Sequence, residues 1–118
     1  MDLQDQLDDL KSEFARTAPP GRPALYEAKI EELRASFALE EAVRIGDEAP
    51  DFALTDARGN SVSLANLMQR GPVIVTFYRG GWCPYCNLQL RAYQAILPQV
   101  AALGVAWSRS RHNSQTAH

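Results

Sequence analysis

Cysteine and histidine are scarce in this chain of 118 residues. The two cysteines are Cys83 and Cys86, and the two histidines, His112 and His118, lie close to the C-terminus. A zinc site made of cysteine and histidine would need all four, and no apolar pattern in the tail positions the histidines, so zinc binding is disfavoured. Because no cysteine is left over for a structural bridge, the pair indicates a reducing compartment, the cytoplasm.

Long apolar segments are also missing. No stretch approaches the ~20 apolar residues that a membrane-spanning helix needs. The N-terminus, MDLQD, is acidic and lacks the apolar stretch of a secretory signal. We therefore expect a cytoplasmic protein that makes no contact with membranes. Hydrophobic residues make up 46% of the chain, which is enough for one packed globular domain.

Acidic side chains are absent from the second half of the chain. All fourteen Asp and Glu residues lie at or before Asp56, whereas residues 57–118 contain six arginines. The net charge of the whole chain is −2, which argues against a dedicated nucleic-acid-binding protein. The half that holds the cysteines is electropositive. Its arginines either lower the thiol pKa of Cys83 or form a solvated basic face.

Two segments near the N-terminus repeat apolar residues at helical spacing, and a proline-rich stretch from Thr17 to Pro23 separates them. The repeating residues are Leu3, Leu7, Leu10 and Phe14 in the first segment and Tyr26, Ile30, Leu33 and Phe37 in the second. We expect an antiparallel helical hairpin over residues 1–44. Its apolar stripes would pack on the rest of the chain, on each other, or against a second copy in a homodimer.

Residues 45–105 carry the pattern of an α/β domain. Strands are predicted at residues 52–54 and 61–63, joined by a turn that contains Gly59-Asn60, and Ser63 is expected to cap a short helix over residues 64–68. The run from Val73 to Tyr78 is apolar and β-branched, which is typical of a strand buried on both faces.

A longer helix follows the cysteines and reaches about Leu103, with a kink expected at Pro98. Strand, cysteine corner and helix form half of a βαβ unit. The partner strand is expected after Gly104.

Cys83 and Cys86 stand between the predicted strand and the predicted helix. A thiol at a helix N-terminus faces unpaired N–H groups and the positive end of the helix dipole, which favour the thiolate. Cys83 is therefore the candidate nucleophile, and Cys86 is close enough to resolve its adduct as a disulfide. The alternative, two inert core cysteines, fits poorly with the Gly-Gly-Trp approach and the intervening Pro-Tyr.

Two motifs resemble those of the alkyl hydroperoxide reductase and thiol-specific antioxidant family, the peroxiredoxin-like branch of the thioredoxin superfamily. Residues 45–54, IGDEAPDFAL, look like the entry motif of that family, and residues 77–86, FYRGGWCPYC, look like its active-site segment. The resemblance covers about half of the chain directly. It implies a thioredoxin-like α/β fold behind the N-terminal helical hairpin.

The resemblance also implies an activity. Cys83 matches the peroxidatic cysteine, which attacks a hydroperoxide and becomes a sulfenic acid. Cys86 would resolve it, and thioredoxin, a related reductase or a small thiol would reduce the disulfide. Neither a metal nor an organic cofactor is implied. The supporting corner is formed by Tyr78, Arg79, Trp82, Pro84 and Tyr85.

Within that corner, Pro84 is expected to stiffen the loop between the sulfurs. Trp82 and Tyr85 either shield the sulfurs, contact a partner or simply pack. Arg79 would supply positive charge beside the cysteines.

Two departures from the family leave other functions open. The family carries Thr or Ser three residues before the peroxidatic cysteine, and Gly80 stands there. The family also uses an arginine from a later strand, which we expect to be missing here, so that Arg79 would be its electrostatic substitute. The cysteine corner is equally similar to those of thioredoxins and glutaredoxins, so thiol–disulfide exchange is the alternative activity. A further alternative is an inactive domain that binds a partner through its helices.

The tail, residues 106–118, shows no strand pattern, and no proline follows Pro98. We therefore expect an irregular tail and a thioredoxin-like fold that lacks its C-terminal half. A shift of reading frame near Gly104 or Val105 would account for this, because another frame can encode an apolar strand there. A genuine short variant with an unstructured tail is the alternative.

Overall fold

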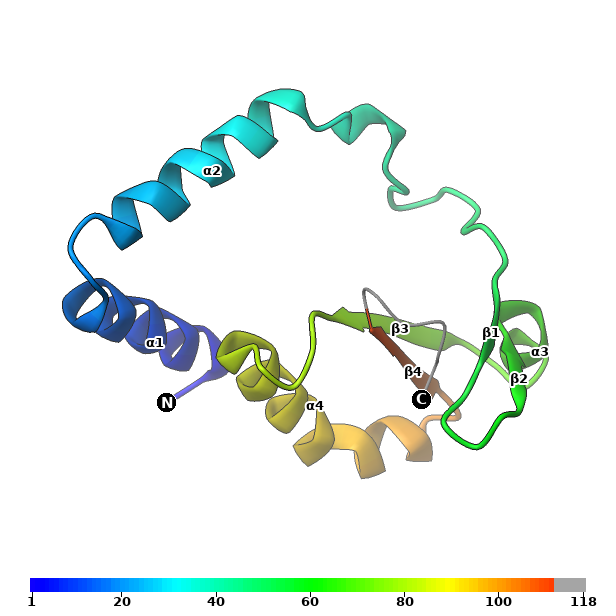
Figure 1. Ribbon diagram of the computed structural model, residues 1–118. Coiled ribbons are helices and arrows are strands. Elements are labelled where there is room, and N and C mark those ends of the chain that lie inside the picture. Colours follow the sequence, from blue (N-terminus) through cyan, green and yellow to red (C-terminus); the bar gives the residue numbers. More distant parts are fainter. Residues whose placement is uncertain (112–118) are drawn as a thin grey trace. The chain divides into compact units, whose positions relative to one another are not determined.

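The computed structural model describes residues 1–111 (Figure 1). The chain divides into two compact units, Met1–Ala49 and a second unit that begins at Pro50. The first unit is helical, and the second combines helices with two small β-sheets. The division at Ala49 lies close to the domain boundary that we predict between residues 44 and 45, and that boundary stays a prediction.

The first unit contains α1 (Leu3–Thr17), α2 (Arg22–Ser36) and the short 3-10 helix η1 (Leu39–Glu41). The Asp2 carboxylate caps α1 by accepting a hydrogen bond from the Asp5 amide over 2.8 Å. Both expected helices are present. They diverge from each other on either side of the turn that connects them (Figure 1). Near that turn the rings of Phe14 and Tyr26 stack 5.3 Å apart.

The second unit opens with a β-hairpin of β1 (Ala53–Thr55) and β2 (Ser61–Ser63). Its turn is held by the Asp56 carboxylate, which accepts hydrogen bonds from the amides of Arg58 and Asn60 over 2.9 and 2.8 Å. These bonds, chiefly those from Asn60, hold the pKa of Asp56 below its usual value. The predicted hairpin is confirmed, although its first strand begins at Ala53 and not at residue 52.

A short helix, α3 (Leu64–Met68), follows β2 directly. The Ser63 hydroxyl accepts a hydrogen bond from the Asn66 amide over 3.1 Å, which confirms the predicted cap. Leu64, the first residue of this helix, is one of the few buried apolar side chains among the described residues.

The centre of the second unit is a βαβ unit made of β3 (Val73–Tyr78), α4 (Pro84–Ala102) and β4 (Ala106–Arg111). The two strands pair in parallel, with Val73 opposite Ala106. The partner strand that a βαβ unit requires after Gly104 is therefore present, although the sequence pattern of this segment predicts an irregular tail. Pro98 lies inside α4 and does not end the helix.

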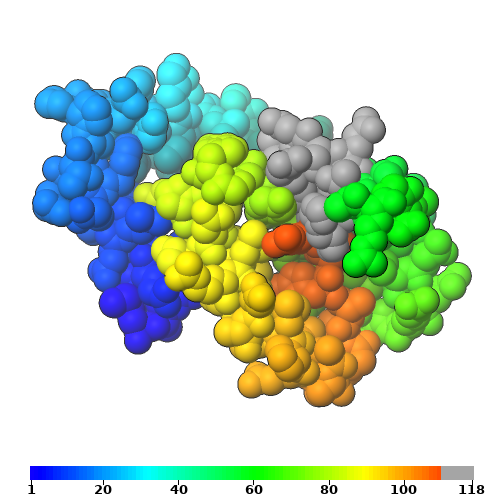
Figure 2. Space-filling model, turned by 60° about the horizontal axis from the view of Figure 1, so that its bottom comes forward, coloured from blue at the N-terminus to red at the C-terminus, as the bar shows by residue number. Residues whose placement is uncertain are grey.

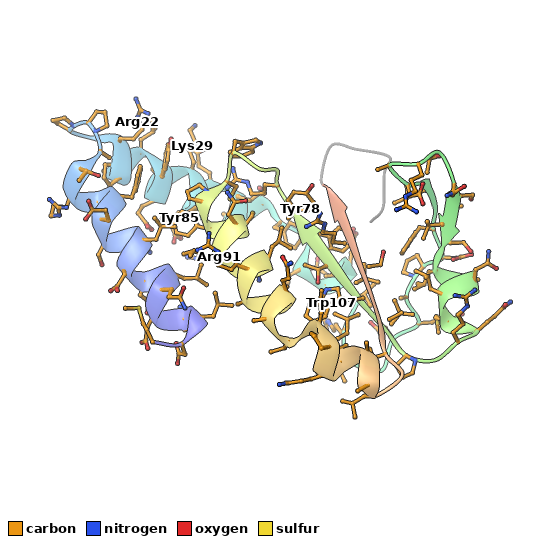
Figure 3. The ribbon with its side chains drawn as sticks, turned by 90° about the horizontal axis from the view of Figure 1, so that it is seen from below. Arg22, Lys29, Tyr78, Tyr85, Arg91 and Trp107 are labelled. Atoms are coloured by element: carbon orange, nitrogen blue, oxygen red, sulfur yellow. The ribbon has the colours of Figure 1, made fainter. Side chains whose placement is uncertain are left out.

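Trp107 fastens β4 to the rest of this unit, and Figure 3 shows it beside α4 and the strands. Its Nε1 donates a 2.7 Å hydrogen bond to the Thr76 hydroxyl on β3. On its other side the ring lies 4.7 Å from the ring of Tyr93 on α4. The Trp107 side chain of β4 therefore contacts both β3 and α4.

The expectation of an irregular tail from residue 106 is wrong for Ala106–Arg111, which form β4. The small polar residues that alternate with Trp107 and Arg109 have a composition that does not predict a strand. The strand forms because it pairs with β3 and contacts α4. Residues 112–118, the rest of the predicted tail, lie outside the described part of the chain.

The prediction that β3 is buried on both faces is also wrong. Ile74 is 37% exposed and Phe77 is 70% exposed. Among residues 1–111, β3 has one neighbouring strand, β4, and α4 lies over the face that carries Thr76. Phe77 lies on the opposite face, where most of its side chain is exposed. Figure 2 shows the outer surface of α4 in yellow to orange.

Candidate functional site

The loop after β3 brings both cysteines to the start of α4. Pro84 is the first residue of the helix, and Cys83 precedes it as the capping residue. The amide of Cys83 donates a 3.0 Å hydrogen bond to the Gly80 carbonyl, which closes the loop into a turn. Proline suits the first helical position because it has no N–H to leave unpaired. The sequence thus places a sulfur where a capping oxygen normally stands.

The Cys83 sulfur takes the role of the capping atom. It accepts a hydrogen bond from the Cys86 amide over 3.4 Å. The Cys86 sulfur in turn accepts one from the Arg79 amide, also over 3.4 Å. Both thiols are free and buried, Cys83 with 2% of its surface exposed and Cys86 with 9%. Each sulfur therefore has a backbone donor and little contact with water.

The pKa values of the two thiols are shifted in opposite directions. Burial on its own raises the pKa of Cys83, but hydrogen bonds from the Cys86 thiol and amide, together with the charge of Arg79, outweigh it and leave that pKa below its ordinary value. Burial raises the pKa of Cys86 above its ordinary value, and the neighbouring Cys83 sulfur raises it further. The site thus favours one thiolate, at Cys83, next to a protonated thiol.

Arg79 and Trp82 form a pair at the edge of the cysteine loop. The Arg79 guanidinium lies over the Trp82 ring, 4.8 Å from its centroid. Gly80 makes this arrangement sterically feasible. Its φ of 145° is rare for other residues, and a Cβ there would lie 2.6 Å from Trp82 Nε1. The glycine that departs from the family pattern is required by this geometry.

Asn87 is a structural member of the loop that our sequence reasoning missed. Its side-chain amide donates a 2.9 Å hydrogen bond to the Gly81 carbonyl and so spans the cysteine loop. The sequence does show an amide side chain directly after the CxxC pair, which could have indicated a hydrogen bond across the loop.

The other expected corner residues are distributed around the loop. Pro84 is exposed, and Tyr85 is half-buried in the first turn of α4. The Tyr78 ring faces β4, since the Arg109 guanidinium lies 5.4 Å from its centroid. Figure 3 shows Tyr78 at the strands and Tyr85 at the start of α4. The contacts of Tyr78 are thus with β4, and its role in the corner stays a prediction.

A second feature of this unit is a pocket of about 340 Å³ between α4 and β4. Its lining is mainly apolar, and neither cysteine contributes to it. The lining residues are Leu90, Tyr93, Gln94, Leu97, Trp107 and Arg109.

Known proteins resemble this part of the chain in sequence. The sequence profile described as the AhpC/TSA family matches residues 45–117, more than half of the chain. The chain belongs to the AhpC/TSA family. The fold of this AhpC/TSA chain is accordingly a partial thioredoxin-like α/β fold with an N-terminal helical region, as the resemblance implied.

Curated relatives of this AhpC/TSA chain include proteins with two kinds of name. Thiol-disulfide oxidoreductase ResA of Bacillus thuringiensis (strain Al Hakam) is 35% identical over 69 residues, which cover 58% of this chain and 39% of the relative. ResA of Bacillus subtilis (strain 168) is 30% identical over 82 residues, covering 64% and 45%. "Putative peroxiredoxin MT2597" of Mycobacterium tuberculosis is 42% identical over 60 residues, covering 51% and 38%.

The match with these relatives is therefore partial: this AhpC/TSA chain spans 39% of the length of the first ResA protein. No solved structure shows significant similarity to the chain. In the described part of the chain, no helix is long and apolar enough to cross a membrane. Within residues 1–111, no three His, Cys, Asp or Glu side chains gather closely enough to hold a metal ion.

Proposed function

We propose that Cys83 and Cys86 are a dithiol redox pair, with Cys83 as the attacking thiolate and Cys86 as the resolving thiol. The observation that carries the proposal is the hydrogen bond from the Cys86 amide to the Cys83 sulfur at the start of α4, which helps to lower the pKa of Cys83, whereas burial raises the pKa of Cys86. A thiolate is the reactive form, so the first attack falls to Cys83. The Cys86 thiol stays protonated until the second step, in which it attacks the Cys83 sulfur.

A hydroperoxide is the substrate that we propose first. The Cys83 thiolate attacks one oxygen of the O–O bond, which breaks; the sulfur becomes a sulfenic acid, and the departing alkoxide takes a proton to leave as an alcohol. Cys86 then attacks the Cys83 sulfur, the S–S bond forms, and water leaves. The near-complete burial of Cys83 suits an oxidant as small as a peroxide.

The disulfide must then be reduced by two electrons and two protons. A thioredoxin-type protein or a small thiol supplies both, and is itself oxidised to a disulfide. Trp82, which is 69% exposed beside the loop, offers such a partner an apolar surface.

Thiol–disulfide exchange is the second candidate. Gly80 favours it, because it supplies no hydroxyl to hydrogen-bond a peroxide, and the ResA relatives are named for this activity. Here Cys83 attacks a substrate disulfide, one thiolate leaves, and a mixed disulfide forms. Cys86 then attacks the Cys83 sulfur and releases the second thiol as the internal disulfide closes.

The test separates the two substrates and the two cysteines. Reduced protein is mixed with a hydroperoxide or a small disulfide, and the loss of each oxidant is followed in the wild type, Cys83→Ser and Cys86→Ser. We expect no consumption by Cys83→Ser. Cys86→Ser should consume one equivalent and stop, with a sulfenic acid or a mixed disulfide trapped on Cys83.

The oxidant that is consumed identifies the activity. Faster consumption of the hydroperoxide supports the peroxidase, and faster consumption of the disulfide supports the exchanger. If neither oxidant is consumed by the wild type, the redox proposal fails and an inactive binding domain is the better description. Unchanged consumption by Cys83→Ser would contradict the assignment of the nucleophile.

A further inference from the structure

The apolar stripe of α2 is open to solvent over most of its length. It consists of Tyr26, Ile30 and Leu33 within the helix and of Phe37, the capping residue directly after it. All four are large hydrophobic side chains that remain exposed, Leu33 by 62% and Phe37 by 57%. The Tyr26 ring is stacked on Phe14. The free part of the stripe therefore begins after Tyr26 and includes Ile30, Leu33 and Phe37.

The spacing of this stripe matches a seam between two helices. Successive intervals of four, three and four residues place the side chains at the a and d positions of a heptad, with Ile30 at a and Leu33 at d. Such a seam is most simply buried against a helix with the same spacing. In the same chain α1 has this spacing, but Ile30, Leu33 and Phe37 remain exposed beside it. A second copy of α2 supplies another such helix.

The charges beside the stripe select an orientation for the second helix. Glu27 and Arg34 occupy e positions on one side of the seam, and Lys29 occupies a g position on the other. In an antiparallel pair the e positions of the two helices face each other, so Glu27 of each copy faces Arg34 of the other. In a parallel pair, g faces e, so the opposite charges of Arg22 and Glu27 would meet, but Lys29 would meet Arg34, a like charge. The pattern therefore favours the antiparallel arrangement.

The ion pairs that Glu27 and Arg34 form within the chain do not prevent them from pairing with a second copy. Glu27 lies 3.5 Å from Lys11, and Arg34 pairs with Glu31, but all four side chains are more than half exposed. Exposed ion pairs of this kind contribute little to stability and reform readily.

From the spacing and the charges together, we propose that the α2 stripe is a self-association surface, where two copies of this chain pair through antiparallel α2 helices. The dyad lies between Ile30 and Leu33. Two reciprocal ion pairs, Glu27 with Arg34, flank the apolar contact. Two helices of this length form an interface at the small end of the known range, so the dissociation constant of the dimer should lie in the micromolar range.

The association is measured by sedimentation velocity on the full chain, kept reduced so that no intermolecular disulfide contributes, from about 1 to 200 µM. We expect a concentration-dependent shift from monomer to dimer. Leu33→Glu should leave a monomer throughout. Because Leu33 is exposed, helix content by circular dichroism should stay unchanged in this variant.

A charge swap tests the orientation. Glu27→Arg or Arg34→Glu alone places two like-charge contacts in each dimer and should weaken association by about tenfold. The double variant restores both intermolecular pairs, but not the pairs with Lys11 and Glu31 within the chain, so its recovery reports on the dimer alone. Glu32→Arg, at an outward-facing c position, is the matched control and should not weaken association.

Three results would overturn the proposal: a monomer over the whole concentration range, a dimer unaffected by Leu33→Glu, or a double variant as weak as the single ones. Each is independent of the redox chemistry. Association should persist in the Cys83→Ser variant, so failure of either proposal leaves the other intact.

Discussion

The amide of Cys86 donates a hydrogen bond to the sulfur of Cys83 over 3.4 Å. This bond makes Cys83 the N-terminal cap of α4, the helix that contains Cys86. A capping atom that carries negative charge is stabilised by the helix N-terminus, so the bond that starts α4 also favours the Cys83 thiolate. Helix formation and thiol activation thus depend on the same contact.

Arg79 is expected to lower the pKa of Cys83 through its side-chain charge. In Arg79→Gln that charge is lost, so the Cys83 pKa should rise and alkylation at neutral pH should slow. The backbone bond from residue 79 to the Cys86 sulfur remains. The pH profile of alkylation in the Cys86→Ser background measures the effect.

Arg91→Gln is the matched control for this prediction. Arg91 is an exposed arginine of α4 and does not contribute to the lowered pKa of Cys83. A profile that moves equally in both variants would show that net charge, and not the position of Arg79, sets the Cys83 pKa.

Gly80→Ala should destabilise the cysteine loop. The φ of 145° is unfavourable for alanine, and the new Cβ would displace Trp82 from beneath Arg79. Backbone strain of this kind costs about 1–3 kcal/mol. Urea unfolding should show the loss. Gly81→Ala is the control, since a Cβ there meets nothing within 4 Å, and equal stability of the two variants would refute the steric account.

Asn87→Asp keeps the shape of the side chain but removes the donor to the Gly81 carbonyl. It also adds a negative charge within the cysteine loop, beside the Gly81 carbonyl, and a negative charge there disfavours the thiolate. The pKa of Cys83 should therefore rise, as followed by thiolate absorbance in the Cys86→Ser background. Gln99→Glu adds the same charge near the far end of α4 and should leave the profile in place. Matching shifts in the two variants would mean that the loop position is irrelevant.

The bond between Trp107 and Thr76 should contribute about 1 kcal/mol to the free energy of unfolding. Trp107→Phe and Thr76→Val each remove it, and the double variant should cost less than the sum of the two. A double-mutant cycle by urea unfolding measures the coupling. Additive losses would show that the two side chains do not interact, and would place β4 in doubt.

Sequence reasoning recovered the elements that depend on local signals. The β1–β2 hairpin has its Gly-Asn turn, α3 has its Ser63 cap, and Val73–Tyr78 reads as a strand by composition. The cysteine corner followed from its position between strand and helix. These features need only neighbouring residues to specify them.

What sequence reasoning missed depends on contacts between distant residues. β4 is stabilised by Thr76 and Tyr93, which lie outside its own sequence, so its mixed composition gave no strand signal. The exposure of Phe77 was also missed, because an apolar run does not reveal how many strands and helices cover it. The role of Asn87 depends on how the loop folds back over Gly81.

The central claim is that electrostatics, and not exposure, decides which cysteine reacts first. Exposure alone favours Cys86, which has 9% of its surface exposed against 2% for Cys83, whereas the pKa values favour Cys83. The most direct measurement treats reduced wild-type protein at neutral pH with less than one equivalent of an alkylating reagent, which reacts with the thiolate and forms an adduct that Cys86 does not resolve, then locates the adduct by mass spectrometry. The account predicts the adduct on Cys83, and an adduct mainly on Cys86 would contradict it.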